Sequence, residues 1–292
     1  MSLSSRLSAL APALATLAPA LSTLAPARAL VGLAPGAVTL ARLEGVLKPK
    51  LVAKRVLECG PAAPGEPWQG AAAALPAITA ELKDLRCDVT VVLSNHFVRY
   101  ALVPASATPM SEDEETAYAR YCFAKVHGER AKAWEVRLSG ADATSPRVAS
   151  AIDPGLLAAI RASFPAGGRP RLLSVQPYLM AAFNRSEARR GRHSGWLLLV
   201  EPQRACLACI EDGRWTAVHN AKGDYEAPQR WGELLERERY VAGAAPGDVT
   251  VHARMPAPAQ SGDWRFRVLG GPAPEGWSAS DDRRLAMALC AA

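Results

Sequence analysis

The chain has 292 residues, of which 49% are hydrophobic, and its 34 basic and 28 acidic residues give a formal net charge of +6. This length and hydrophobic content can fill a sizeable core, which excludes an intrinsically disordered protein and allows two modest domains or one two-lobed domain. The charges are dispersed along the chain, so we expect no nucleic-acid partner.

Residues 1–35 contain a seven-residue repeat, LSALAPA, LATLAPA and LSTLAPA, in which each repeat carries one proline. Because an interior proline destabilises a helix by ~3 kcal/mol, the leucines at helical spacing do not predict a coiled coil or a membrane-spanning helix. We expect a disordered low-complexity extension. The uncharged run after Arg6 and the APARA sequence at 25–29 also resemble an export leader, and cleavage near residue 28 or 30 is the alternative.

A first folded unit is predicted over residues 36–192. Apolar and charged residues alternate at its start, which favours strands, and later segments carry capping signals for helices. The strongest are an S-x-x-E capping box at Ser111 and Glu114, and Asp153 followed by Pro154 at a helix start. The predicted strands are 37–45, 49–59, 89–93, 96–104, 133–139, 147–152 and 171–177, and the predicted helices are 74–85, 111–127, 155–164 and 178–185.

The sequence VTVVLSNHFVRYALVP at 89–104 places Ser94, Asn95 and His96 between two apolar runs. Ser94 and Asn95 are good turn formers, and Pro104 closes the second run, so we predict a hairpin. A catalytic trio would need an acid or a metal ligand nearby, and none is evident in this stretch.

A polar connector over 184–193 carries four arginines. We interpret it as a solvated link between two halves of the fold, with a contact to anionic lipid or an acidic partner as the alternative. The second unit, over 193–292, repeats the plan of a three-strand meander followed by helices and strands. Its predicted strands are 195–203, 204–213, 214–220, 248–255 and 263–271, and its predicted helices are 228–241 and 280–292. The repeated order predicts a two-lobed α/β protein.

The order of several features resembles a known family: a hairpin ending in Pro104, a helix opened by MSEDEE, a strand, the IDPGLL helix start and the LLSVQP strand. It is the group of cytoplasmic actin-like assembly proteins of type IV pilus and type II secretion systems (PilM, GspL cytoplasmic domain and MshI). The resemblance covers residues 30–292 as a pattern. It implies an α/β, actin-like (ribonuclease H-like) two-lobed fold with a hairpin-helix subdomain inserted in the first lobe. It also implies a scaffold at the cytoplasmic face of the inner membrane that binds an inner-membrane protein with a short cytosolic N-terminus.

Members of that fold that hydrolyse ATP carry a D-x-G motif in the first hairpin of each lobe. The glycine lets backbone N–H groups approach the phosphates, and the aspartate lies near the metal. Residues 34–36 of this chain read A-P-G, so the carboxylate is absent and proline removes a donor. Residues 201–203 read E-P-Q and keep one acid but no glycine. Gly36 and Glu201 are therefore the candidate cofactor-binding residues of two degenerate phosphate loops.

Other catalytic or metal-binding templates are absent from the sequence, including the P-loop, the dinucleotide-binding G-x-G-x-x-G, the nucleophile elbow and H-E-x-x-H. Cys206 and Cys209 form a C-x-x-C on a predicted strand, where a spacing of three places the side chains on opposite faces. We therefore expect structural, reduced thiols, and we predict no metal site and no catalytic residue.

Two functional hypotheses follow. The first is a non-catalytic, degenerate actin-like scaffold that needs no cofactor and presents a groove to a membrane-anchored partner. The alternative is a residual ATP-binding protein or ATPase in which Glu201 is the phosphate-side acid. The loss of D-x-G at both hairpins favours the scaffold.

Overall fold

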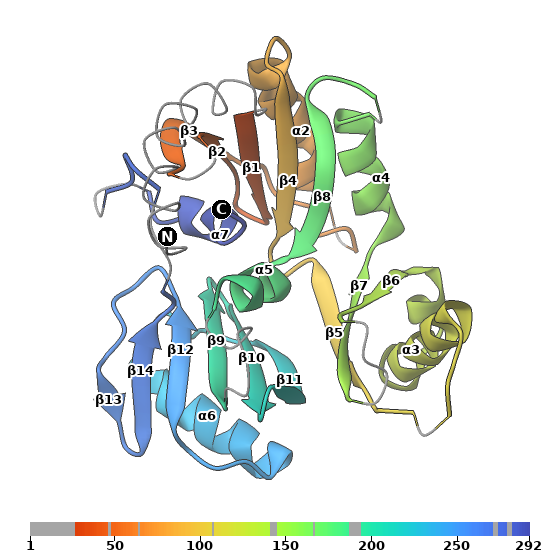
Figure 1. Ribbon diagram of the computed structural model, residues 1–292, viewed down its shortest axis with the longest axis vertical. Coiled ribbons are helices and arrows are strands. Elements are labelled where there is room, and N and C mark those ends of the chain that lie inside the picture. The colour runs from red at the N-terminus through yellow and green to blue at the C-terminus, as the bar shows by residue number, and fades with distance from the viewer. Residues whose placement is uncertain are drawn as a thin grey trace, which may run out of the picture.

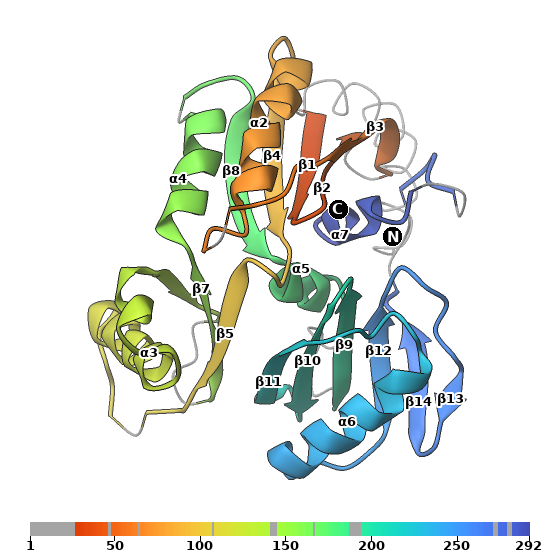
Figure 2. The same cartoon turned by 180° about the vertical axis from the view of Figure 1, so that it is seen from behind.

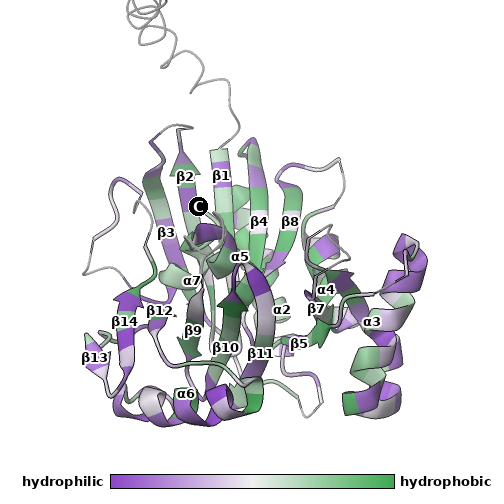
Figure 3. Cartoon of the chain, turned by 60° about the horizontal axis from the view of Figure 1, so that its bottom comes forward, coloured by the Kyte–Doolittle hydropathy of each residue, from purple (hydrophilic) through white to green (hydrophobic). Residues whose placement is uncertain are grey.

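The computed structural model shows two lobes with a small third unit at one side (Figure 1). The structure describes residues 27–45, 48–63, 65–106, 108–140, 145–165, 167–186, 194–270, 274–278 and 282–292. Among these residues, no helix combines the length and the apolar character that crossing a membrane requires. Figure 3 shows green, apolar strands in the interior of both lobes and more purple, polar residues on the outer elements.

The first lobe is built on a five-stranded sheet. In spatial order its strands are β3 (Lys50–Glu58), β2 (Ala37–Glu44), β1 (Ala27–Ala34), β4 (Cys87–Leu93) and β8 (Arg171–Pro177). β1 pairs antiparallel with β2 and parallel with β4, and β4 pairs parallel with β8. The helices α2 (Gln69–Leu82) and α4 (Pro154–Ser163) lie on one face of this sheet (Figure 2), where Leu75 and Ile160 share a buried cluster with Val31 and Val91.

The second lobe repeats this order with one addition at the edge. Its strands in spatial order are β11 (Arg214–Lys222), β10 (Arg204–Glu211), β9 (Gly195–Glu201), β12 (Asp248–His252), β14 (Trp264–Val268) and β13 (Gln260–Ser261). The helix α6 (Gln229–Ala242) buries Trp231 and Leu235 against one face of the sheet. Both sheets thus consist of an antiparallel meander whose first strand pairs in parallel with the fourth, which confirms the two-lobed α/β plan.

The third unit is inserted between β4 and α4. It has an antiparallel sheet in the order β5 (Val98–Val103), β7 (Arg147–Ile152) and β6 (Glu135–Leu138), covered by α3 (Glu112–His127) and the 3₁₀ turn η1 (Gly128–Ala133). The predicted capping box is confirmed, since Glu114 N donates to Ser111 Oγ at 3.3 Å and Ser111 N donates to Glu114 Oε2 at 2.8 Å. Phe123 anchors α3 in the buried cluster of this subdomain.

The predicted hairpin over 89–104 is wrong in its pairing. A turn does form, because Phe97 N donates to Ser94 O at 2.9 Å, but β4 and β5 belong to different sheets. Both edges of β4 are already paired, with β1 and β8, so the returning strand pairs with β7 instead. The turn after β4 is therefore the corner at which the chain leaves the first lobe for the inserted subdomain.

Two short helices cross between the lobes. α5 (Tyr178–Arg185) ends the first lobe but buries Leu179 in a cluster with Leu197 of β9. α7 (Leu285–Leu289) follows the second lobe but buries Leu289 in a cluster with Leu30 of β1. The prediction that the second lobe extends over 193–292 is thus wrong for the last helix, which packs on the first lobe. The leucines of α7 cover the face of β1 and β2 that α2 leaves open.

The predicted extension over residues 1–35 is wrong for residues 27–34. These form β1, in which Ala29, Val31 and Leu33 are fully buried between β2 and β4. The leucine- and alanine-rich composition of the repeat continues into this strand, so composition alone does not show where the fold begins. The remainder of the predicted extension, residues 1–26, lies outside the described residues. Cleavage near residue 28 or 30, as the export alternative expects, would cut into the central strand of the first lobe.

Candidate functional site

The two hairpins that are predicted to correspond to phosphate loops occupy equivalent places in the two sheets. β1 and β2 join through the turn at Pro35 and Gly36, and β9 and β10 join through the turn at Pro202 and Gln203. Gly36 is exposed, and a Cβ added to it would meet nothing within 4 Å. At the second hairpin Gln203 adopts a left-handed φ of 57°. A side chain therefore stands where the second phosphate loop has its glycine.

Glu201, the single acid at these hairpins, is buried and both of its oxygens accept hydrogen bonds. Ser94 Oγ donates to Glu201 Oε1, and Asn95 N donates to Glu201 Oε2 at 3.0 Å. Burial raises the pKa of Glu201, and these hydrogen bonds partly oppose that increase. The carboxylate thus holds the turn after β4 rather than facing open space.

Further hydrogen bonds complete this contact, which we call the clasp: the turn residues 94–96 held by Glu201, Pro202 and Asn220 of the second lobe. His96 Nε2 lies 2.9 Å from Pro202 O, and Asn220 Nδ2 donates to Asn95 O at 2.8 Å and to Val98 O at 3.1 Å. Burial and then the charge of Arg204 lower the pKa of His96 to about 4. A neutral imidazole with its proton on Nε2 can therefore donate to the Pro202 carbonyl.

The space between the lobes beside Glu201 is almost filled. Tyr178, His252, Arg254 and Met287 help to enclose a cavity of only about 20 Å³. A small-molecule pocket usually has ~300–1,000 Å³. α7 contributes to the filling, because a Cβ added to Gly32 of β1 would lie 3.0 Å from Met287 Cε. The cavity beside Glu201 therefore has no room for a nucleotide in this conformation.

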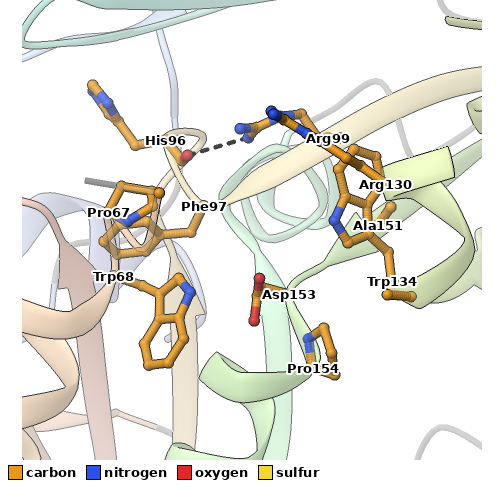
Figure 4. A pocket seen from close by; sticks show the side chains of 12 residues that line it. Pro67, Trp68, His96, Phe97, Arg99, Arg130, Trp134, Ala151, Asp153 and Pro154 are labelled. Atoms are coloured by element: carbon orange, nitrogen blue, oxygen red, sulfur yellow. Dashed lines mark hydrogen bonds between the residues drawn. The ribbon is translucent and has the colours of Figure 1, made fainter. Parts of the chain in front are cut away.

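A larger cavity of about 480 Å³ opens between the first lobe and the inserted subdomain (Figure 4). We call it the groove. Its walls come from the segment before α2, the turn after β4, η1 and the residues after it, and the start of α4. Its lining residues are Gly65, Pro67, Trp68, His96, Phe97, Arg99, Arg130, Ala133, Trp134, Ala151, Asp153 and Pro154. Aromatic rings, two arginines and one carboxylate make this surface suited to a peptide rather than to a phosphate group alone.

Local signals explain how two groove residues are placed. Asp153 Oδ1 accepts from Gly155 N at 2.8 Å, which confirms the predicted N-cap of α4. Trp68 packs so closely on Gly155 that an added Cβ would lie 2.8 Å from the indole Cζ2. No sequence motif indicates the groove, because residues on its walls are up to 89 positions apart in the chain.

The cysteine prediction is confirmed in its geometry. Cys209 belongs to the cluster under α6, whereas Cys206 belongs to the cluster on the opposite face of the sheet. Burial raises the pKa of both thiols, so neither is activated as a thiolate. Within the described parts of the chain, no group of three His, Cys, Asp or Glu side chains is arranged to hold a metal ion.

Comparison with protein-family models and with curated protein sequences found no match. Among solved structures, the chain is similar to a Bacteroides thetaiotaomicron protein of unknown function with an actin-like ATPase fold. The identity is 10% and the TM-score 0.54, over 77% of this chain and 81% of that one. It is also similar to the cytoplasmic domain of EpsL, an inner-membrane component of the type II secretion system of Vibrio cholerae. Here the identity is 11% and the TM-score 0.52, over 90% and 93% of the two chains.

A third similar structure is the PilM–PilN type IV pilus biogenesis complex, at 16% identity and a TM-score of 0.51 over 77% of this chain and 81% of that one. The similar structures thus include secretion and pilus proteins of the kind that the sequence resembles, which confirms the predicted resemblance. Identities this low establish the fold alone. The chain has the actin-like two-lobed α/β fold, with a subdomain inserted after β4.

Proposed function

We propose that this protein is a non-catalytic actin-like scaffold that takes part in the assembly of a type IV pilus or a type II secretion machine. The observation that carries the proposal is the clasp, in which Ser94 and Asn95 occupy both oxygens of Glu201. An acid that acts on a phosphate-bound metal needs adjacent space for the metal and the phosphate. Both oxygens of Glu201 already accept a hydrogen bond, and the cavity beside them has only about 20 Å³.

In this proposal the protein lies at the cytoplasmic face of the inner membrane and the groove receives its partner. The groove is the larger cavity, and it lies between two separately folded units, where binding sites often occur. The similarity to EpsL and to the PilM–PilN complex supports a membrane protein of a secretion or pilus system as the partner. An extended cytosolic segment of that partner is the occupant that we infer, because the groove is lined by Trp68, Phe97 and Trp134.

The catalytic side of the proposal is tested by thermal unfolding with and without Mg-ATP. The scaffold predicts no shift of the midpoint, whereas a ligand at about 100 times its Kd would stabilise the protein by ~2.7 kcal/mol. A shift of several degrees that disappears in Glu201→Gln would establish the residual ATP-binding alternative.

The partner side is tested with synthetic peptides that match the cytosolic N-terminal segments of inner-membrane pilus and secretion proteins from the same genome. Ala133→Trp adds bulk at an exposed position of the groove without removing a contact, and it should abolish binding of any peptide that the wild-type chain retains. Ala80→Trp, at an exposed position of α2 outside the groove, is the matched control and should leave binding unchanged. Equal binding by the wild type and Ala133→Trp would place the partner elsewhere.

A further inference from the structure

Two arginines, Arg99 and Arg130, lie at one end of the groove, and Arg204 lies near Arg99. Neither Arg99 nor Arg130 forms an ion pair with a carboxylate among the residues that the structure describes, whereas the charge of Arg204 is close to that of Glu201. Arg99 donates only to the carbonyl oxygens of His96 and Val98, over long distances of 3.3 and 3.4 Å.

Arg99 carries a partly buried positive charge, which is unfavourable unless an anion pairs with it. Its side chain is half-buried, and burial followed by the charge of Arg204 lowers its pKa. A guanidinium that has lost part of its water normally pairs with a carboxylate, which it binds through two parallel N–H donors. Arg99 uses one terminal nitrogen for its two weak bonds. The donors that match a carboxylate are therefore left for a group from outside the chain.

The other titratable groups that line the groove do not neutralise this end. His96 is neutral at physiological pH, because burial lowers its pKa to about 4. Asp153 is the one carboxylate in the lining, and Oδ1 accepts from the backbone of α4. Figure 4 shows Asp153 beside Pro154 on the α4 side of the groove, apart from Arg99 and Arg130.

We propose that the groove binds an extended peptide that places an acidic side chain between Arg99 and Arg130 and an adjacent apolar side chain against the partly exposed ring of Trp68. The inference rests on the proposed function in one respect, namely that the groove is the partner-binding surface. It adds the chemistry of the partner. The acidic residue supplies the ion pair that the described residues do not provide, and the apolar residue covers aromatic surface at the opposite wall.

The test is selection of peptides from a random phage-displayed library on the immobilised full-length chain. Each peptide is fused to the coat protein through its C-terminus, so no free C-terminal carboxylate is present. Wild-type protein should enrich sequences with Asp or Glu at one fixed position next to an apolar residue. The Arg99→Met variant should lose that acidic preference, and a selected acidic peptide should bind it at least about tenfold more weakly. Arg214→Met, which alters an exposed arginine at the far end of β11, should behave as the wild type does.

The outcomes separate this inference from the proposed function. Peptides that Ala133→Trp no longer binds, but that show no acidic preference, would overturn the acidic anchor and leave the partner groove intact. Peptides that bind Ala133→Trp as well as they bind the wild type would show that the groove is not the partner surface. Millimolar inorganic phosphate should not displace a selected peptide. Complete displacement would show a site for small anions and would overturn the peptide proposal.

Discussion

The clasp predicts that Ser94→Ala destabilises the protein more than the loss of an ordinary buried hydroxyl. Ser94 Oγ donates to the buried Glu201 carboxylate and accepts from His96 N at 3.1 Å. A hydrogen bond to a charged group contributes ~1.5–3 kcal/mol and a neutral one ~0.5–1.5 kcal/mol. We therefore expect the free energy of unfolding to fall by ~2–4 kcal/mol, because the substitution removes both of these hydrogen bonds.

Urea unfolding monitored by circular dichroism measures this change. The matched control is Ser186→Ala, since Ser186 is also buried but donates to a neutral acceptor, Phe183 O, at 2.7 Å. That substitution should lower the free energy of unfolding by ~0.5–1.5 kcal/mol. A double-mutant cycle with Glu201→Ala, which removes the acceptor, then isolates the contact, with an expected coupling of ~1–3 kcal/mol. A loss no larger than that of Ser186→Ala, or strict additivity in the cycle, would refute the clasp as described.

Three further predictions concern the same region. Glu201→Gln keeps the side-chain shape but removes the charge. Burial raises the pKa of the Glu201 carboxyl in the folded protein above its ordinary value of 4.5. Ionisation of Glu201 therefore destabilises the wild type as the pH rises. The variant should therefore gain stability relative to the wild type from pH 4.5 towards neutrality, and a constant difference across urea titrations would contradict this. Burial lowers the pKa of His252 from 6.5 to about 4 in the folded protein. Between pH 6.5 and 4, His252 is therefore protonated in the unfolded chain but neutral in the folded one, and wild-type stability should fall as the pH drops through this range. His252→Gln should reduce that slope by up to ~1.4 kcal/mol per pH unit. Gly36→Ala should change stability by less than ~0.5 kcal/mol, since an added Cβ meets nothing within 4 Å, and a larger loss would indicate a structural role for this glycine.

Local chemistry made several features of the fold predictable from the sequence. The capping box at Ser111 and the N-cap at Asp153 form as expected, because each depends on residues within one helical turn. The two replaced phosphate hairpins also lie where the pattern placed them, since strand alternation and turn residues define a hairpin over a few positions.

Features that depend on distant contacts were not predictable in this way. Ser94 and Asn95 have the composition of any polar turn, and their bonds to Glu201 span 107 and 106 residues. The same holds for α7, whose sequence gives no indication that it packs on the lobe at the other end of the chain. The pairing of β5 was mispredicted because a turn signal shows that the chain bends but not which sheet receives the next strand.

The clasp also bears on nucleotide binding, because Glu201 is the acid that the second hairpin could offer to a phosphate-bound metal. To release it, the turn after β4 must separate from the second lobe, which breaks the two bonds to Glu201, the one between His96 and Pro202, and the two made by Asn220. If each of these five bonds contributes at least ~1 kcal/mol, the released state has a population of at most about 1 in 5,000. A nucleotide with an intrinsic Kd of ~1 µM for that state would then show an apparent Kd of at least ~5 mM. Under the scaffold proposal, the absence of D-x-G at both hairpins and the presence of the clasp therefore act in the same direction. The hairpins lack the expected phosphate ligands, and the clasp holds Glu201 on the turn after β4.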